Sequence, residues 1–156
     1  MREFHGCATT RADVNPQAVS DFITDVSRLP EWNGAIEAVT DRPPALAEGA
    51  EWTVTMHPPR MPGWHSISRV EQLDREHLRF AYKTRHADGN PSYVTWAWQI
   101  AGHDGGAEIT VTWDCYLKTL DRRVFGGPVR KRQLAREVPA SLTAPASALS
   151  ATTATQ

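Results

Sequence analysis

Residues 93–115 read YVTWAWQIAGHDGGAEITVTWDC, two alternating segments joined by a short glycine-rich connection. Apolar side chains occupy every second position of both segments: Val94, Trp96, Trp98, Ile100, Ile109, Val111, Trp113 and Cys115. Successive side chains of a strand point to opposite faces, so each segment is predicted to be a strand with one buried face. The connection, residues 102–106, has the composition of a hairpin loop. The two strands should therefore pair antiparallel and share an aromatic face.

Earlier segments continue this strand pattern. Alternation predicts strands at residues 52–56 and 78–83, with these residues on the inward face: Trp52, Val54, Met56, Phe80 and Tyr82. Residues 2–12 and 36–41 are predicted to be two further strands. A strand at residues 65–73 has two possible phases. One face would carry either His65, Ile67, Arg69 and Leu73, or Ser66, Ser68 and Val70.

A helix is predicted between the first two strands. Asn15 is a suitable N-cap residue, and Pro16 suits the first helical position. Apolar residues then recur at helical spacing: Val19, Phe22, Ile23 and Val26. Pro30 should end this helix, because a proline disfavours helical backbone in the residue before it. Residues 31–34 are expected to form a second, short helical turn.

A long C-terminal helix is predicted after Leu120, with a kink at Pro139, because a proline inside a helix removes one hydrogen bond. This region carries the main cluster of positive charge: Lys118, Arg122, Arg123, Arg130, Lys131, Arg132 and Arg136. Most such runs are solvated helix faces, but this one also suits an acidic partner, such as an acyl carrier protein, or an anionic membrane surface. The small, polar residues 150–156 are predicted to be a disordered tail.

Composition is typical of one globular domain, which we expect to span residues 1–149 of the 156. A net charge of -1 gives no bulk attraction to nucleic acid. No apolar run is long enough to cross a bilayer or to act as a secretory signal, so a cytoplasmic protein is expected. A monomer or a homodimer is expected. The six histidines lack metal-ligand spacing, and there is no GxGxxG or P-loop motif, so neither a metal nor a cofactor is expected.

Three segments carry a family resemblance. Residues 19–33 combine a helical apolar pattern with the closing run Pro30-x-Trp32-Asn33. Residues 48–50, EGA, precede the strand of Trp52, and residues 106–113 read GAEITVTW. With the order of elements, these segments resemble the START-like superfamily, also called SRPBCC, which includes polyketide cyclase/dehydratases, lipid-transfer domains and the birch-pollen allergen fold. The resemblance implies an α+β helix-grip fold: a seven-stranded, curved antiparallel sheet around a long C-terminal helix, with two short helices between strands 1 and 2.

The resemblance also implies a cavity between the concave face of the sheet and the last helix. Taken alone, an aromatic stripe at strand spacing is more typical of simple core packing. In this fold, the expected cavity-lining residues are Trp32, Trp52, Met56, Phe80, Tyr82, Trp96, Trp98 and Trp113. Flat aromatic side chains and a methionine suit a planar or polycyclic apolar ligand.

Catalysis in such a cavity would need a few polar groups among apolar walls. The candidates are Arg69, Tyr82, His65 and Cys115. Arg69 would stabilise an enolate and Tyr82 would donate a proton, roles that similar residues serve in aromatase/cyclase relatives. Each also has a purely structural interpretation, with Arg69 on the solvent face and Tyr82 bonded to a backbone carbonyl.

The expected function is binding of a hydrophobic small molecule, such as a polyketide, another aromatic compound or a lipid. Cofactor-independent cyclisation, aromatisation or dehydration is one outcome of such binding, since enclosure alone orients a reactive chain. A carrier or sensor that does not react its ligand is an alternative, as is an interaction module with a filled core. An acid–base pair in the cavity would favour the enzyme, and a purely apolar cavity would favour the carrier.

Overall fold

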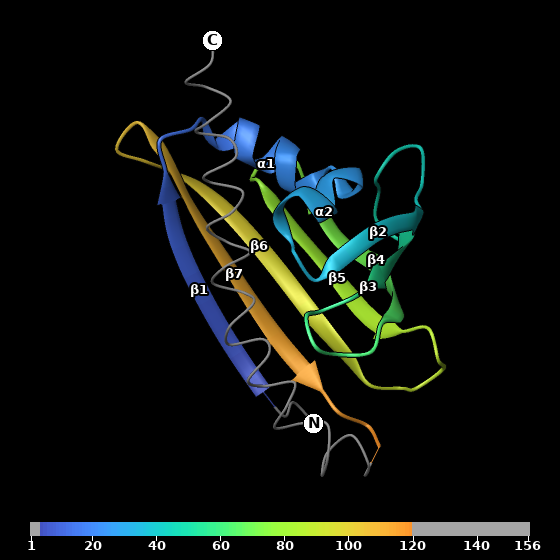
Figure 1. Ribbon diagram of the computed structural model, residues 1–156. Coiled ribbons are helices and arrows are strands. Elements are labelled where there is room, and N and C mark those ends of the chain that lie inside the picture. The colour runs from blue at the N-terminus through green and yellow to red at the C-terminus, as the bar shows by residue number, and fades with distance from the viewer. Residues whose placement is uncertain (1–3, 120–156) are drawn as a thin grey trace.

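The computed structural model describes residues 4–119. Seven strands form one antiparallel sheet in the order β1-β7-β6-β5-β4-β3-β2, and the sheet curves around the side on which the short helices lie (Figure 1). The strand bounds are β1 Phe4–Ala12, β2 Ile36–Asp41, β3 Glu51–Met56, β4 Trp64–Asp74, β5 Arg79–His86, β6 Tyr93–His103 and β7 Gly106–Tyr116. The predicted seven-stranded antiparallel sheet is confirmed. The predicted C-terminal helix, the kink at Pro139, the basic residues from Arg122 to Arg136 and the tail at 150–156 lie outside the described residues.

The β6–β7 hairpin is tighter than the predicted five-residue loop. His103 pairs with Gly106, which leaves only Asp104 and Gly105 in the turn. Both central residues have positive φ, 47° and 81°, as a type I′ turn requires. This turn matches the right-handed twist of the flanking strands, and therefore fixes the register of β6 and β7.

The helical region between β1 and β2 differs from the prediction in its boundaries. Helix α1, Pro16–Thr24, begins as predicted, since the Asn15 side chain accepts a hydrogen bond from the Gln17 backbone N–H at 2.8 Å. It ends at Thr24 because the Asp25 side chain accepts from the Ser27 N–H and starts a 3₁₀ turn, η1, Val26–Arg28. Helix α2, Leu29–Trp32, then contains Pro30 near its N-terminus, a position where proline costs no hydrogen bond.

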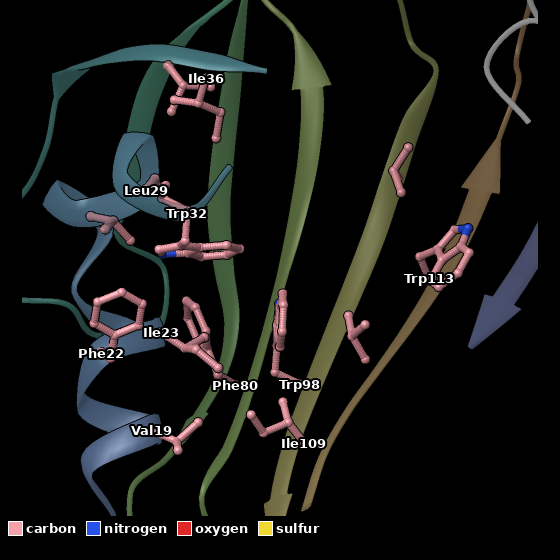
Figure 2. Packing of buried hydrophobic residues seen from close by; sticks show 14 of the residues in the cluster. Val19, Phe22, Ile23, Leu29, Trp32, Ile36, Phe80, Trp98, Ile109 and Trp113 are labelled. Atoms are coloured by element: carbon pink, nitrogen blue, oxygen red, sulfur yellow. The ribbon is translucent and has the colours of Figure 1, made fainter. Parts of the chain in front are cut away.

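The helices bury one end of the inward face of the sheet. Helix α1 packs against β6 and β7, and α2 packs against β2. Figure 2 shows side chains from these helices directed at Phe80 of β5 and Trp98 of β6. The helical side chains in this contact are Val19, Phe22, Ile23, Leu29 and Trp32. One end of the aromatic face is therefore hydrophobic core.

Candidate ligand-binding site

Strand pairing aligns aromatic side chains in a row across the inward face. Tyr82 of β5 pairs with Trp96 of β6, and Trp96 pairs with Trp113 of β7. The ring centroids of Trp52 and Tyr82 are 5.1 Å apart, those of Tyr82 and Trp96 are 6.5 Å apart, and those of Trp96 and Trp113 are 6.3 Å apart. These distances lie within the range of favourable aromatic contacts. We call these four residues, Trp52, Tyr82, Trp96 and Trp113, the aromatic row.

The predicted lining residues fall into two groups. Trp32, Phe80 and Trp98 lie in the core beneath the short helices, with 5%, 3% and 5% of their surface exposed. In the aromatic row, Trp52 and Trp113 are likewise buried, with 2% and 8% of their surface exposed, and only Tyr82 and Trp96 are partly exposed. Met56 is buried on the same face and pairs with Ile36 and Trp64. All eight residues share the inward side as predicted, and their contact with a ligand stays a prediction.

The structure corrects the expected position of Arg69. Ser66, Ser68 and Val70 are the buried residues of β4, so the second of the two phases is the true one. Arg69 is exposed and pairs with Glu51 and Lys83 on the outward side of the sheet. An arginine there does not reach a ligand held on the inward face, and Arg69 and Tyr82 are not brought together.

The other two polar candidates are also separated by the sheet. His65 is exposed on the outward side, where its Nδ1 lies 3.3 Å from the Thr55 hydroxyl. Cys115 faces inward and is 1% exposed. It pairs with Val94 and Phe4, so it lies beside the β7 end of the aromatic row.

A polar strip at the β4–β5 end of the inward face was not predicted from the sequence. The Ser68 and Thr84 hydroxyls are 2.8 Å apart, and the Trp64 indole N–H donates to the Ser66 hydroxyl at 3.0 Å. Trp64 also stacks on His86, with ring centroids 5.3 Å apart. The strip could have been inferred from Ser66 and Ser68, which alternate along β4 on one face. The rule that apolar residues face inward does not favour that face. The inward face is therefore aromatic in the middle and polar at one end.

Tyr82 is the titratable group of the aromatic row. Burial raises the pKa of Tyr82 to about 12, and the neighbouring Trp98 indole N–H acts in the opposite direction, lowering it. At neutral pH this phenol is therefore fully protonated. It is a hydrogen-bond donor rather than a base.

The pKa of Tyr82 predicts a loss of stability at high pH. The folded chain keeps this proton at a pH where the unfolded chain, with an ordinary pKa of 10.0, has lost it. The contribution is intact below pH 10 and is lost as the pH rises through 10 toward 12. Urea unfolding gives the free energy of unfolding of Tyr82→Phe minus that of the wild type. We expect this difference to be about 1.4 kcal/mol larger at pH 11 than at pH 8. An unchanged difference between the two proteins would show that Tyr82 ionises as freely in the folded state as in the unfolded chain.

Comparison with known proteins places this geometry in a family. A family model described as polyketide cyclase/dehydrase and lipid transport matches residues 6–151. The chain belongs to this family. The resemblance to the START-like superfamily is thereby confirmed. No match was found among curated proteins.

Several solved structures share this fold at low sequence identity. The Zhui aromatase/cyclase from Streptomyces sp. R1128 is 17% identical with a TM-score of 0.73, covering 94% of this chain and 93% of that chain. The di-domain ARO/CYC StfQ from the steffimycin biosynthetic pathway is 9% identical with a TM-score of 0.77, covering 96% of this chain and 51% of that one. Ara h 8.0201 is 16% identical with a TM-score of 0.67, covering 95% and 98%. These likenesses establish the fold.

Residues 4–119 lack two features, a membrane-spanning helix and a group of metal ligands. No helix among them is long and apolar enough to span a membrane. No three histidine, cysteine, aspartate or glutamate side chains within them are grouped as metal ligands would be. The predictions of a cytoplasmic location and of a monomer or homodimer stay predictions.

Proposed function

We propose that this protein binds a planar, hydrophobic small molecule of the polyketide or aromatic class against the aromatic row. The observation that carries the proposal is the unbroken contact from Trp52 through Tyr82 and Trp96 to Trp113. The partly exposed rings of Tyr82 and Trp96 offer an apolar surface, on which a planar ligand gains both burial and aromatic contact. Membership of a family described by polyketide cyclisation, dehydration and lipid transport supports the same class of ligand.

The chemistry proposed for the site is cyclisation, aromatisation or dehydration of the bound molecule without a cofactor. Among residues 4–119, the inward positions that pairing aligns with the aromatic row carry no Asp, Glu, Lys or Arg. The protein therefore contributes mainly by enclosing and folding a reactive chain, which raises the effective concentration of its reacting carbons. Protonated Tyr82 would donate a hydrogen bond to an oxygen that gains negative charge during enolisation.

A carrier that does not react its ligand is the second candidate. The observation that favours it is the same lack of charged side chains at the described inward positions beside the aromatic row, because an apolar wall with few polar groups suits binding more than proton transfer. His86, on the polar strip, is a candidate for a base, since it shares the inward face with Thr84 on β5. If the protein does catalyse a reaction, the double variant His86→Gln/Tyr82→Phe tests the role of these two side chains. Turnover of the substrate by this variant would show that enclosure alone suffices for the reaction.

An acyl carrier protein is retained as a proposed partner for delivery of the substrate. The cluster of positive charge from Lys118 to Arg136 supports it, since a basic surface attracts an acidic partner. The residues concerned, apart from Lys118, lie outside the described part of the chain.

The binding proposal is tested by titrating the protein with N-phenyl-1-naphthylamine, an apolar fluorescent probe, and by native mass spectrometry of the protein as purified. We expect one probe molecule per chain, and Trp96→Ala should weaken its binding about tenfold or more through lost aromatic contact. Tyr93→Ala is the matched control, because Tyr93 lies on the same strand and stacks with Tyr116 on the outward side. Equal weakening by both substitutions, or no binding by the wild type, would refute the proposal.

A further inference from the structure

The two edge strands of the sheet differ in how well they resist pairing with a further strand. β2 is six residues long, its register with β3 shifts twice, and it carries the exposed acids Glu37 and Asp41. β1, the opposite edge in Figure 1, is nine residues long and pairs with β7 in one unbroken register. Short length, bulges and charge are the usual means by which an edge strand avoids another strand. β1 lacks the first two.

The direction of the β1 backbone follows from the hydrogen-bond pattern of its neighbours. The two-residue turn between β6 and β7 makes His103 and Gly106 a pair that exchanges both backbone hydrogen bonds. Such pairs alternate along a ladder with pairs that exchange none. Ile100 and Ile109 form a pair of the second kind, and the Ile100 N–H accordingly donates to the opposite side, toward β5. The backbone groups of Ile109 therefore point at β1, where Thr10 pairs with it.

Alternate residues of β1 therefore direct their backbone groups away from β7. Thr10 and the other even-numbered residues point their N–H and C=O groups at β7, and the odd-numbered residues point theirs at the free edge. These odd-numbered residues are all exposed: His5, Cys7, Thr9 and Arg11. Within residues 4–119, their backbone groups have no hydrogen-bond partner. A row of unpaired N–H and C=O groups is a template for another strand.

The charges of β1 do not protect this edge. His5 Nδ1 lies 2.8 Å from a carboxylate oxygen of Asp114, and Arg11 Nε lies 3.2 Å from one of Glu108. Both acids belong to β7 of the same chain, so each base of β1 already has an acidic neighbour. Between these two ends the strand carries only glycine, cysteine, alanine and threonine. Neither net charge nor bulk therefore keeps a second strand away.

We propose that β1 pairs antiparallel with β1 of a second copy of this chain, so that the two seven-stranded sheets become one continuous sheet. With Ala8 of one copy beside Ala8 of the other, all nine residues of each strand are paired. Cys7 then faces Thr9 of the other copy. His5 faces Arg11, each beside its own acid on β7. Odd-numbered residues thus meet odd-numbered residues, and their free backbone groups bond to each other.

This pairing ends at a dimer. The contact is isologous, since the same strand of both copies takes part in it, so it occupies the β1 edge of both. The edges that remain are those of β2, which the register shifts and the acids protect. The strand is its own complement, which is the reason for assigning a second copy as the partner.

Sedimentation velocity of the full chain over a range of concentrations tests the proposal. We expect a reversible dimer with a Kd of about 10–100 µM, because two paired strands form a small interface. Thr9→Pro should raise this Kd about tenfold or more, since proline removes an N–H directed at the partner and none directed at β7. Thr40→Pro is the matched control, because Thr40 is exposed on the other edge strand, at a register shift, and should leave the Kd unchanged.

Two results of this experiment overturn the proposal. One is a wild-type protein that stays monomeric up to about 500 µM, well above the expected Kd. The other is a dimer that Thr9→Pro leaves intact, which would place the interface elsewhere.

Hydrogen exchange followed by nuclear magnetic resonance tests the register without any variant. In the dimer, the amides of Cys7 and Thr9 should become protected as the protein concentration rises through the Kd. The amides of Ala8 and Thr10, which point at β7, should be protected at every concentration. Fast exchange of Cys7 and Thr9 in a sample that sediments as a dimer, or slow exchange of both in a monomer, contradicts the proposal.

Cys7 provides a chemical measurement of the same register. In the proposed dimer, the Cys7 side chains of the two copies are diagonal neighbours, about 7–8 Å apart. The short cross-linker 1,2-bis(maleimido)ethane should therefore join the two chains, and Cys7→Ser should abolish the product. Cys115 is 1% exposed, so it does not compete for the reagent. Absence of a cross-linked dimer from a sample that sediments as a dimer contradicts this register.

Discussion

Trp98→Ala should lower the free energy of unfolding by about 3–5 kcal/mol, the cost of removing a large buried aromatic side chain. Trp98 is 5% exposed and contacts Trp32 of α2, so its loss removes an aromatic contact between the short helices and β6. Urea denaturation followed by circular dichroism measures the change. The helices should also detach first, so protection of α1 amides from hydrogen exchange should fall more than that of β7 amides.

Trp96→Ala is the matched control for this substitution. Trp96 lies two residues earlier on the same strand and face but is only partly buried. Its removal should cost clearly less than that of Trp98, while weakening ligand binding. If the two substitutions cost the same, the division of the inward face into a core end and a binding end is wrong.

Gly6→Val should destabilise the protein by about 3 kcal/mol and displace the Trp113 indole. A Cβ atom built at Gly6 would lie 2.0 Å from Cζ2 and 2.2 Å from Cε2 of Trp113. The indole thus lies flat over the glycine of the neighbouring strand, and Gly6 pairs directly with Trp113. Because Trp113 ends the aromatic row, the substitution should also weaken binding of N-phenyl-1-naphthylamine.

Cys7→Val provides the control on the same strand. Cys7 is the next residue of β1, is exposed on the outward side and pairs with Thr112. Valine suits a strand, so this substitution should change stability by less than about 0.5 kcal/mol. Comparable losses for the two variants would mean that the cost arises from the strand and not from the contact with Trp113.

Much of the sheet follows from period-two patterns in the sequence. Residues 93–115 predicted the β6–β7 hairpin because both of its strands place bulky apolar side chains at alternate positions, a pattern that only one phase can bury. The aromatic row follows from the same alternation once the strands are paired. Neither step requires knowledge of distant contacts beyond antiparallel neighbours.

The phase of β4 could not be predicted because the strand buries polar residues. Ser66 and Ser68 face inward, at 4% and 3% exposure, and their hydroxyls are satisfied by Trp64 and Thr84. These partners come from another part of β4 and from β5, so the burial is favourable only in the assembled sheet. The irregularity between Val70 and Gln72 then changes the alternation within the strand. Because the phase of β4 could not be predicted, the side of the sheet on which Arg69 lies could not be predicted either.

The division of the inward face into core and binding surface also could not be predicted from the sequence. Trp98 and Trp96 have the same residue type, strand and facing, and only the position of α1 and α2 distinguishes them. That position depends on the early end of α1, where the Asp25 carboxylate caps the Ser27 N–H. A single side-chain hydrogen bond at a helix end is a local choice that apolar spacing does not reveal.

The central claim is that the ligand lies on the aromatic row, and its most direct test is the set of intermolecular nuclear Overhauser effects from bound N-phenyl-1-naphthylamine. The account predicts contacts from the probe to the ring protons of Tyr82, Trp96 and Trp113, and none to Tyr93 and Tyr116, which stack together on the outward side. Contacts to the outward tyrosines without contacts to the row would contradict it.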